Sequence, residues 1–290
     1  MANSIAKFKK YVPLLDEVYK NAALTSVLDS DASLAQEGAN ANEIIIPKIS
    51  MDGLGDYDRN GGYTNGDVTL TNETVQFNYE RGRMFSVDAM DDEETAGIAY
   101  GKLASEFIRT KVAPEGDAFR FATYAGIEGI SKVAAGATLN DGAEVVAALR
   151  GGSNKMDEDE VPYEERYLFI TPTLKGMVED LDSTKSREVL GRFAQVIPVP
   201  QSRFYTAIDL KSGKDGEAAG GYAKNADGKE INFMIIHKPA VMQYNKHIAP
   251  KVITPEANQD ADAWKFGYRK YGLADAYENK VAGIYLHHKA

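Results

Sequence analysis

The chain of 290 residues contains no cysteine. This absence excludes disulfide bonds, thiolate catalysis and cysteine-ligated zinc or iron–sulfur centres. No apolar run approaches the roughly 20 residues that a membrane-spanning helix needs. No apolar stretch follows the lysines at the start of the chain, so no secretory signal is expected. We therefore expect no membrane association and a protein that works in the cytoplasm where it is made.

Positive charge is also scarce. Lysine and arginine number 33 against 43 aspartates and glutamates, which gives a formal net charge of −10. Binding to a phosphate backbone depends on clustered cations that release counterions. The densest cluster is Lys7, Lys9 and Lys10, which is too small for a nucleic-acid-binding arm. The acidity instead indicates solubility through like-charge repulsion at the surface.

Motifs for catalysis and nucleotide binding are missing. The four histidines are His237, His247, His287 and His288. They form no HExxH motif, and neighbours on a strand cannot both face one site. No phosphate-binding loop occurs, and Gly53-x-Gly55 lacks the third glycine of a dinucleotide fingerprint. Runs of adjacent acids, such as residues 157–160, are typical of solvated faces. We therefore assign no catalytic residue, cofactor site or metal site, and expect no enzyme.

A long β-hairpin between Asn42 and Asp88 is the most informative feature. Residues 42–51 are β-like but contain Pro47, which favours an edge strand or a free ribbon. Residues 52–67 are rich in glycine, and residues 68–79 alternate strongly between apolar and polar. We expect Arg81–Val87 to continue this strand and the ribbon to reach about 30 Å from its base. An isolated ribbon is marginally stable, so another part of the chain or another copy must cover it.

The hairpin tip also matches the first half of a calcium-binding loop. Asp56, Asp58 and Asn60 alternate before Gly61, and Asp67 stands at the twelfth position. However, strands flank the loop instead of helices, and the twelfth residue is aspartate instead of glutamate. Aspartate, asparagine and glycine are also what any hairpin turn requires. We assign no calcium site on this pattern, and calorimetry at millimolar calcium would test it.

The remaining pattern predicts a mixed α+β fold, because strands and helices occur in groups without regular βαβ alternation. Expected helices cover residues 5–28, 91–113, 115–124, 140–149 and 172–181, with Pro114 kinking or stopping the long one. An extended arm is expected over 32–41, and a charged loop over 155–165. Expected strands cover residues 166–171, 195–199, 231–236, 241–246, 247–254, 264–271 and 281–286, with an exposed loop or irregular hairpin over 211–229.

Several stretches, taken together and in this order, resemble the major capsid proteins of tailed bacteriophages, which share the HK97-like fold. They are GLGDYDRNGGY (53–63), RGRMFSVDAMDDEET (81–95), VAPEGDAFRF (112–121), VIPVPQSRFYT (196–206), MIIHKPAVMQ (234–243) and GIY (283–285). The resemblance covers essentially the whole chain. None of these stretches is a chemical signature.

This resemblance implies a domain plan. Residues 1–41 would be an N-terminal arm that embraces adjacent subunits, and 42–88 an extended hairpin, the E-loop, that lies across a neighbour. Residues 89–126 and 231–290 would form the P domain with its long spine helix, and 127–230 the A domain near the symmetry axes. The candidate interface residues are Asp56, Tyr57, Arg59, Tyr63, Arg81 and Arg83.

The same resemblance implies a structural subunit that assembles into hexamers, pentamers and an icosahedral shell. The shell would enclose double-stranded DNA without sequence-specific binding, in a virion assembled in the cytoplasm of a bacterial host. A separate scaffolding protein is an expected partner, because the fold-like sequence starts almost at Met1, and a portal is a second expected partner. No Lys–Asn crosslink is expected, since Lys48 is the only lysine of the hairpin and lies near its base. The alternatives are an encapsulin-like bacterial nanocompartment and, more distantly, a cytoplasmic hydrolase.

Overall fold

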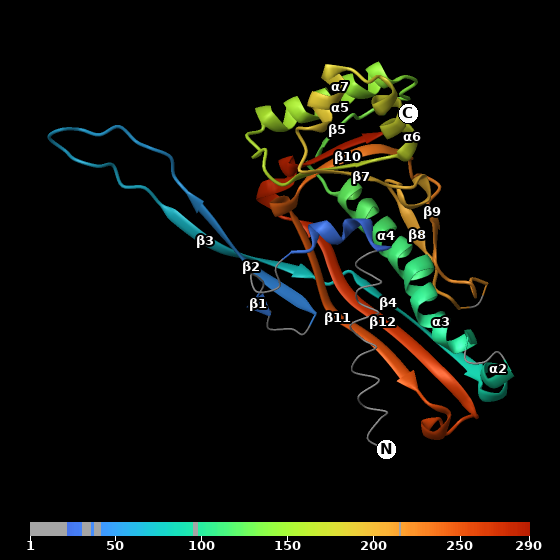
Figure 1. Ribbon diagram of the computed structural model, residues 1–290. Coiled ribbons are helices and arrows are strands. Elements are labelled where there is room, and N and C mark those ends of the chain that lie inside the picture. Colours follow the sequence, from blue (N-terminus) through green and yellow to red (C-terminus); the bar gives the residue numbers. More distant parts are fainter. Residues whose placement is uncertain (1–21, 31–35, 38–41, 95–97, 215) are drawn as a thin grey trace.

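The computed structural model describes residues 22–30, 36–37, 42–94, 98–214 and 216–290 (Figure 1). The α-helices are α2 (Ala89–Glu94), α3 (Ile98–Phe107), α4 (Ala113–Gly126), α5 (Gly142–Glu158), α6 (Pro172–Asp180) and α7 (Thr184–Leu190). The strands are β1 (Gln36–Glu37), β2 (Glu43–Met51), β3 (Val68–Gln76), β4 (Tyr79–Asp88), β5 (Ser131–Lys132), β6 (Arg166–Ile170), β7 (Gln195–Pro198), β8 (Ile208–Leu210), β9 (Tyr222–Lys224), β10 (Ile231–His237), β11 (Val241–Ile253), β12 (Ala263–Ala276) and β13 (Ile284–His288). The expected α+β class is confirmed.

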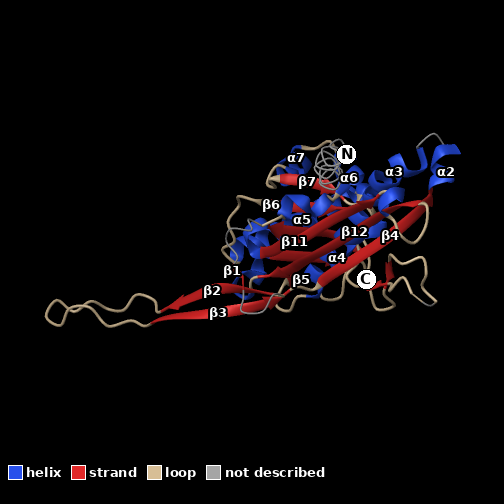
Figure 2. Ribbon diagram, turned by 90° about the horizontal axis from the view of Figure 1, so that it is seen from below, coloured by secondary structure: helices blue, strands red, loops and turns tan. Residues whose placement is uncertain are grey.

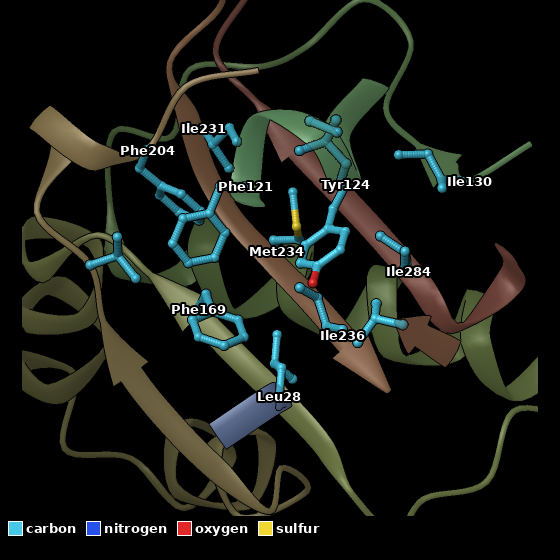
Figure 3. Packing of buried hydrophobic residues seen from close by; sticks show 14 of the residues in the cluster. Leu28, Phe121, Tyr124, Ile130, Phe169, Phe204, Ile231, Met234, Ile236 and Ile284 are labelled. Atoms are coloured by element: carbon cyan, nitrogen blue, oxygen red, sulfur yellow. The ribbon is translucent and has the colours of Figure 1, made fainter. Parts of the chain in front are cut away.

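A five-stranded sheet in the order β5-β13-β10-β6-β7 forms the centre of the α/β unit. Every residue of β10 is buried, because the sheet is covered on both faces. Phe233 and Ile235 face a cluster that includes residues of α5, α6 and α7. Met234 and Ile236 face the opposite cluster, which contains Phe121 and Tyr124 of α4 (Figure 3). The apolar run in β10 therefore reflects burial on two sides.

The C-terminal strands divide between two sheets. The whole of 231–290 was expected to complete the P domain. Instead β10 pairs with β6 and β13, and β13 pairs with β5, so both strands belong to the α/β unit. Only β11 and β12 join the second sheet. The apolar run of β10 indicates burial on both faces, but nothing in the sequence indicates that β6 and β13 are its partner strands.

The second sheet has the order β11-β12-β4 and consists of long antiparallel strands (Figure 2). The helical rod of α3 and α4 runs along it (Figure 1). Ala104 and Ile108 of the rod pack in one cluster with Phe266 and Tyr268 of β12. The expected strands 241–246 and 247–254 are one strand, β11, with a register shift between Asn245 and His247.

Pro114 does not stop the long helix. A π-helical segment, Ile108–Val112, joins α3 to α4 with right-handed helical angles at both of its ends. Proline lacks an N–H and clashes with the carbonyl four residues earlier in a regular α-helix. It is tolerated here because it lies in the first turn of α4, next to a widened turn that changes the local hydrogen-bond register. The expected interruption is thus a π segment within a continuous rod.

The projecting hairpin consists of β2 and β3. They pair antiparallel from Glu43 opposite Gln76 to Met51 opposite Val68, and β1 adds a short third strand beside β2. The expectation that Arg81–Val87 continues this ribbon is wrong. After Phe77 and Asn78 the chain enters β4, which pairs with β12 over its whole length. Apolar residues alternate over only part of each strand, at Phe85 and Val87 in β4 and at Val68 and Leu70 in β3, so periodicity does not separate the two strands.

Other local expectations hold where the structure describes them. Asp141 caps α5 as expected by accepting a hydrogen bond from the Glu144 amide at 2.8 Å. The helix runs to Glu158 and so includes the first residues of the segment 155–165, which was expected to be a loop. Pro172 begins α6 as expected. Of the expected N-terminal helix, residues 5–21 lie outside the described residues and Leu24–Leu28 is a 3₁₀ helix. Among the described residues, no helix is both long and apolar enough to cross a membrane.

Candidate assembly surfaces

The base and the outer part of the hairpin present apolar side chains on opposite faces. The base is buried against the β11-β12-β4 sheet, where Ile44, Ile46 and Val75 of the hairpin contact Met242, Tyr244 and Leu273. Farther out, the side chains of Ile49, Met51, Val68 and Leu70 are 57%, 69%, 72% and 64% exposed. The pairing has no bulge, and side chains alternate between faces with a period of two. The outer apolar residues therefore point away from the face that the base buries.

The base is attached to the body by polar contacts as well. The Lys48 ammonium lies 2.8 Å from the Glu278 carboxylate, and its hydrogen bond to that carboxylate raises the pKa of Lys48. Beyond this residue the hairpin extends freely away from the two sheets (Figure 1). The one lysine of the hairpin is thus used to hold the base.

The tip of the hairpin, residues 52–67, is built by turn chemistry. The backbones of Asp58 and Gly62 exchange two hydrogen bonds, at 3.2 and 2.7 Å, and Gly62 has a φ of 81°. The Asp58 carboxylate accepts from the Asn60 amide at 3.0 Å. Tyr57 and Tyr63 meet edge to face with ring centroids 4.9 Å apart while remaining exposed. The tip is a closed loop that presents aromatic surface outward.

Four of the six candidate interface residues, Asp56, Tyr57, Arg59 and Tyr63, lie on this exposed tip. Of the acids in the calcium-like pattern, Asp58 uses its carboxylate in a turn, and the backbone amide of Asp67 donates to the Asp52 carboxylate at 2.9 Å. Within the described part of the chain, no group of three or more acidic, histidine or cysteine side chains is placed to hold a metal ion.

The other two candidates, Arg81 and Arg83, lie on β4, far from the tip. Arg81 forms an ion pair with Glu115 of α4 at 2.7 Å and donates to the Lys211 carbonyl at 2.7 Å. The hydrogen bond to Glu115 raises the pKa of Arg81. Arg83 donates to the Ala218 carbonyl at 2.8 Å. Both arginines therefore hold the hairpin formed by β8 and β9 within the same subunit.

A groove of about 930 Å³ lies between β4, the α3–α4 rod and the loop that joins β8 to β9. We call it the rod groove. Its apolar lining includes Phe85, Leu103 and Phe107, which are each partly buried. Sequence reasoning missed this groove, because the β8–β9 loop that closes it lies far along the chain from β4 and the rod. No local sequence pattern indicates that these segments meet.

Comparison with known proteins finds likeness in structure only. No family model matches the sequence, and no curated protein sequence matches it. The structure titled as the capsid of the cyanophage P-SCSP1u matches with a TM-score of 0.58 at 12% identity, covering 88% of this chain and 85% of that one. A chain of Gordonia phage Cozz matches with a TM-score of 0.60 at 10% identity, covering 93% and 86%. A virus-like particle from Pyrococcus furiosus matches with a TM-score of 0.56 at 9% identity, covering 93% and 98%.

The chain has the HK97-like capsid fold. In this HK97-like chain a buried polar cluster joins the 3₁₀ segment Leu24–Leu28 to α4. The fully buried Asp117 accepts hydrogen bonds from the Leu24 amide, from the Thr25 amide and hydroxyl, and from Arg203. The Tyr124 hydroxyl donates to the Gln243 side chain of β11 at 2.9 Å. Asp117 directly precedes Ala118 and Phe119 within α4, and an acid at such a position is the sequence signal that could have located this cluster.

Proposed function

We propose that this chain is the major capsid subunit of a tailed bacteriophage and assembles into an icosahedral shell around double-stranded DNA. The observation that carries the proposal is the outer hairpin, whose four apolar side chains stay exposed on a ribbon that is marginal by itself. Large exposed apolar surfaces on soluble proteins indicate interaction sites. The shared fold with the phage chains supports another copy of the chain as the partner.

The energy available from this hairpin suits reversible assembly. Full burial of an aliphatic side chain contributes roughly 1.5–3 kcal/mol. Since Ile49, Met51, Val68 and Leu70 are between 57% and 72% exposed, covering them yields about 5 kcal/mol per hairpin. Association costs an estimated 4–15 kcal/mol. A single hairpin contact between two subunits is therefore weak, whereas the many such contacts in a closed shell together make the shell stable.

The domain plan is proposed with revised boundaries. Residues 1–41 form the arm and residues 42–78 the E-loop. The sheet β11-β12-β4 together with the α3–α4 rod forms the P domain. The α/β unit, including β10 and β13, forms the A domain. Hexamers and pentamers of the subunit, a scaffolding protein and a portal are the proposed partners. The proposed location is the virion, after assembly in the host cytoplasm, and the role requires no catalytic activity.

An encapsulin-like nanocompartment is the second candidate. The match to the Pyrococcus furiosus virus-like particle favours it, because that chain is covered over 98% of its length. Particles that are filled with DNA and carry tails would support the phage subunit. Particles that co-purify with an enclosed enzyme would support the compartment.

Shortening the hairpin tests the proposal. Replacing Gly53–Gly66 by a two-residue turn should leave the subunit folded, because the base and both sheets are untouched, but should abolish shells in negative-stain electron microscopy. The paired substitutions Ile49→Ser and Leu70→Ser should also weaken assembly. The matched control changes the neighbouring pair on the opposite face, Ser50→Thr and Thr69→Ser.

Circular dichroism and thermal unfolding establish that each variant is folded. Normal shells from the shortened variant would show that the hairpin does not link neighbouring subunits. A strict monomer of the unaltered protein at high concentration, with or without scaffold, would count against the shell function itself.

A further inference from the structure

Both Asn–Gly pairs of the chain lie in the hairpin tip. They are Asn60–Gly61 and Asn65–Gly66, and every other asparagine is followed by a residue that has a side chain. All four residues of the two pairs are exposed. The tip projects clear of both sheets in two perpendicular views, so the described body of the subunit does not shield it from water (Figures 1 and 2).

An asparagine followed by glycine has the groups needed to modify itself. Hydroxide removes the proton of the glycine amide, and the amide nitrogen attacks the Cγ carbonyl carbon of the asparagine side chain. A five-membered succinimide ring forms, and the side-chain nitrogen leaves as ammonia. Water then adds to one of the two ring carbonyls and opens the ring to aspartate or isoaspartate. The net reaction converts one amide and one water into one carboxylate and one ammonium ion. Glycine favours the attack because it has no Cβ to hinder the nitrogen.

The structure makes the two pairs unequal, because Asn60 lies in a closed turn. The backbones of Asp58 and Gly62 exchange hydrogen bonds at 3.2 and 2.7 Å around it. The Asn60 backbone amide donates to the Asp58 carboxylate at 3.0 Å. A Cβ on Gly61 would lie 3.1 Å from an oxygen of this carboxylate. Attack on Asn60 therefore requires the turn to open and a second negative charge to form close to the first.

Asn65 is held by fewer contacts. Across the part of the chain that the structure describes, neither the Asn65 amide nor the Gly66 amide donates a hydrogen bond. The backbone is fixed again at Asp67, whose amide donates to the Asp52 carboxylate at 2.9 Å. A Cβ on Gly66 would meet no atom closer than 3.6 Å. The Asn65 side chain and the Gly66 nitrogen are therefore free to approach each other without breaking a turn.

We propose that Asn65, and more slowly Asn60, deamidates spontaneously in the unassembled subunit, and that the new carboxylate weakens assembly. The chemistry is independent of the proposed function, and only the effect on assembly rests on it. The tip already carries four aspartates against one arginine, and whole subunits repel one another through a net charge of −10. Covering a new carboxylate against a neighbouring copy costs more than covering a neutral amide. A subunit that stays unassembled for long therefore assembles less readily.

Mass spectrometry of the whole protein after incubation at about pH 8 tests the chemistry, because each deamidation adds about 1 Da. Trypsin cuts after Arg59 and Arg81, so one peptide carries both pairs, and its fragments locate the added mass. We expect Asn65 to gain mass about fivefold faster than Asn60, which is the effect of about one hydrogen bond that must break. Asn72, which is exposed on β3 and followed by glutamate, is the internal control and should not change.

Gly66→Ala is the matched variant for the mechanism. The methyl group fits, since no atom lies closer than 3.6 Å to its position, but it hinders the attacking nitrogen. Deamidation of Asn65 should therefore fall at least about fivefold, while deamidation of Asn60 should not change. The rate for both asparagines should rise roughly tenfold between about pH 7 and pH 8, because hydroxide removes the amide proton.

Substitutions that reproduce the product test the effect on assembly. Asn65→Asp with Asn60→Asp should assemble at least about threefold more slowly than the unaltered subunit at about 0.1 M salt, and nearly as fast at about 1 M salt, where charges are screened. Asn65→Gln with Asn60→Gln is the neutral control and should assemble like the unaltered subunit. Circular dichroism establishes that each variant is folded.

The outcomes separate this inference from the function beneath it. No more added mass at Asn65 than at Asn72 overturns the chemistry, and equal rates at Asn65 and Asn60 overturn the protection by the closed turn. Equal assembly rates for the aspartate and glutamine substitutions overturn the effect on assembly and leave the shell function intact. If the fresh, unaltered subunit forms no particles, the shell function fails, whereas the mass measurement on that same subunit still decides the chemistry.

Discussion

Replacing Asp117 by alanine should be one of the most destabilising single changes on α4. The carboxylate is fully buried and accepts from the Leu24 amide at 3.0 Å, the Thr25 amide at 3.1 Å and the Thr25 hydroxyl at 2.7 Å. It also pairs with Arg203 at 3.1 Å, whose side chain is 20% exposed. Alanine leaves this cation and the buried donors without their acceptor. Breaking a buried ion pair costs about 3–5 kcal/mol, and we expect a loss in that range.

Urea denaturation of the hairpin-shortened variant measures this loss without a contribution from assembly, which would otherwise stabilise the folded subunit. With an m-value of about 3 kcal/mol per M, the midpoint should fall by about 1 M or more. The control is Asp260→Ala, which removes a 2.7 Å ion pair with Lys265. The Asp260 side chain is 82% exposed. That change should cost less than about 1 kcal/mol. If Asp117→Ala costs no more than the control, the buried cluster does not anchor the Leu24–Leu28 segment.

Two further predictions concern packing and pH. Gly152→Ala should destabilise the subunit by about 1–3 kcal/mol in thermal unfolding, because the new methyl group would lie 2.8 Å from Tyr285 and 3.0 Å from Ile235. The adjacent Gly151→Ala, in open space, should stabilise it by about 0.5–1 kcal/mol, and the opposite order would refute the packing of α5 on the sheet. Burial, with a smaller effect of His288, lowers the pKa of His287 to about 4. The unfolded chain therefore binds more protons, and stability should be lost as pH falls from about 6.5 to about 4, by up to about 3 kcal/mol. Urea unfolding at pH 7, 5 and 4 should show this slope and a smaller one for His287→Phe; equal slopes would exclude His287 as the cause.

Sequence reasoning located elements whose signals are local. Asp141 begins α5 and Pro172 begins α6, because a cap and a preset φ act within one turn. It also found the hairpin tip, since glycine, asparagine and aspartate are required wherever the chain reverses tightly. The four tip candidates are exposed, and their role at an interface between subunits stays a prediction.

What it missed depends on pairing between distant segments. β4 and β3 have similar alternation, yet one pairs with β12 and the other with β2. The fully apolar β10 requires cover on two faces, but only the folded chain shows that β6 and β13 flank it. The contacts of Arg81 with Glu115 and of Arg83 with Ala218, both within the subunit, could likewise not be read from the sequence, and the interface role of these arginines stays a prediction.

The hairpin and one wall of the rod groove lie on one continuous segment of chain. β3 leaves the hairpin and, after Phe77 and Asn78, becomes β4, which lines the rod groove. Asn78 is fixed to β12 by two hydrogen bonds with the Ala274 backbone, at 2.8 and 3.1 Å. Phe77 stacks on Tyr271 with centroids 4.9 Å apart. Because this junction is held on both sides, it sets the angle between the hairpin and the rod groove.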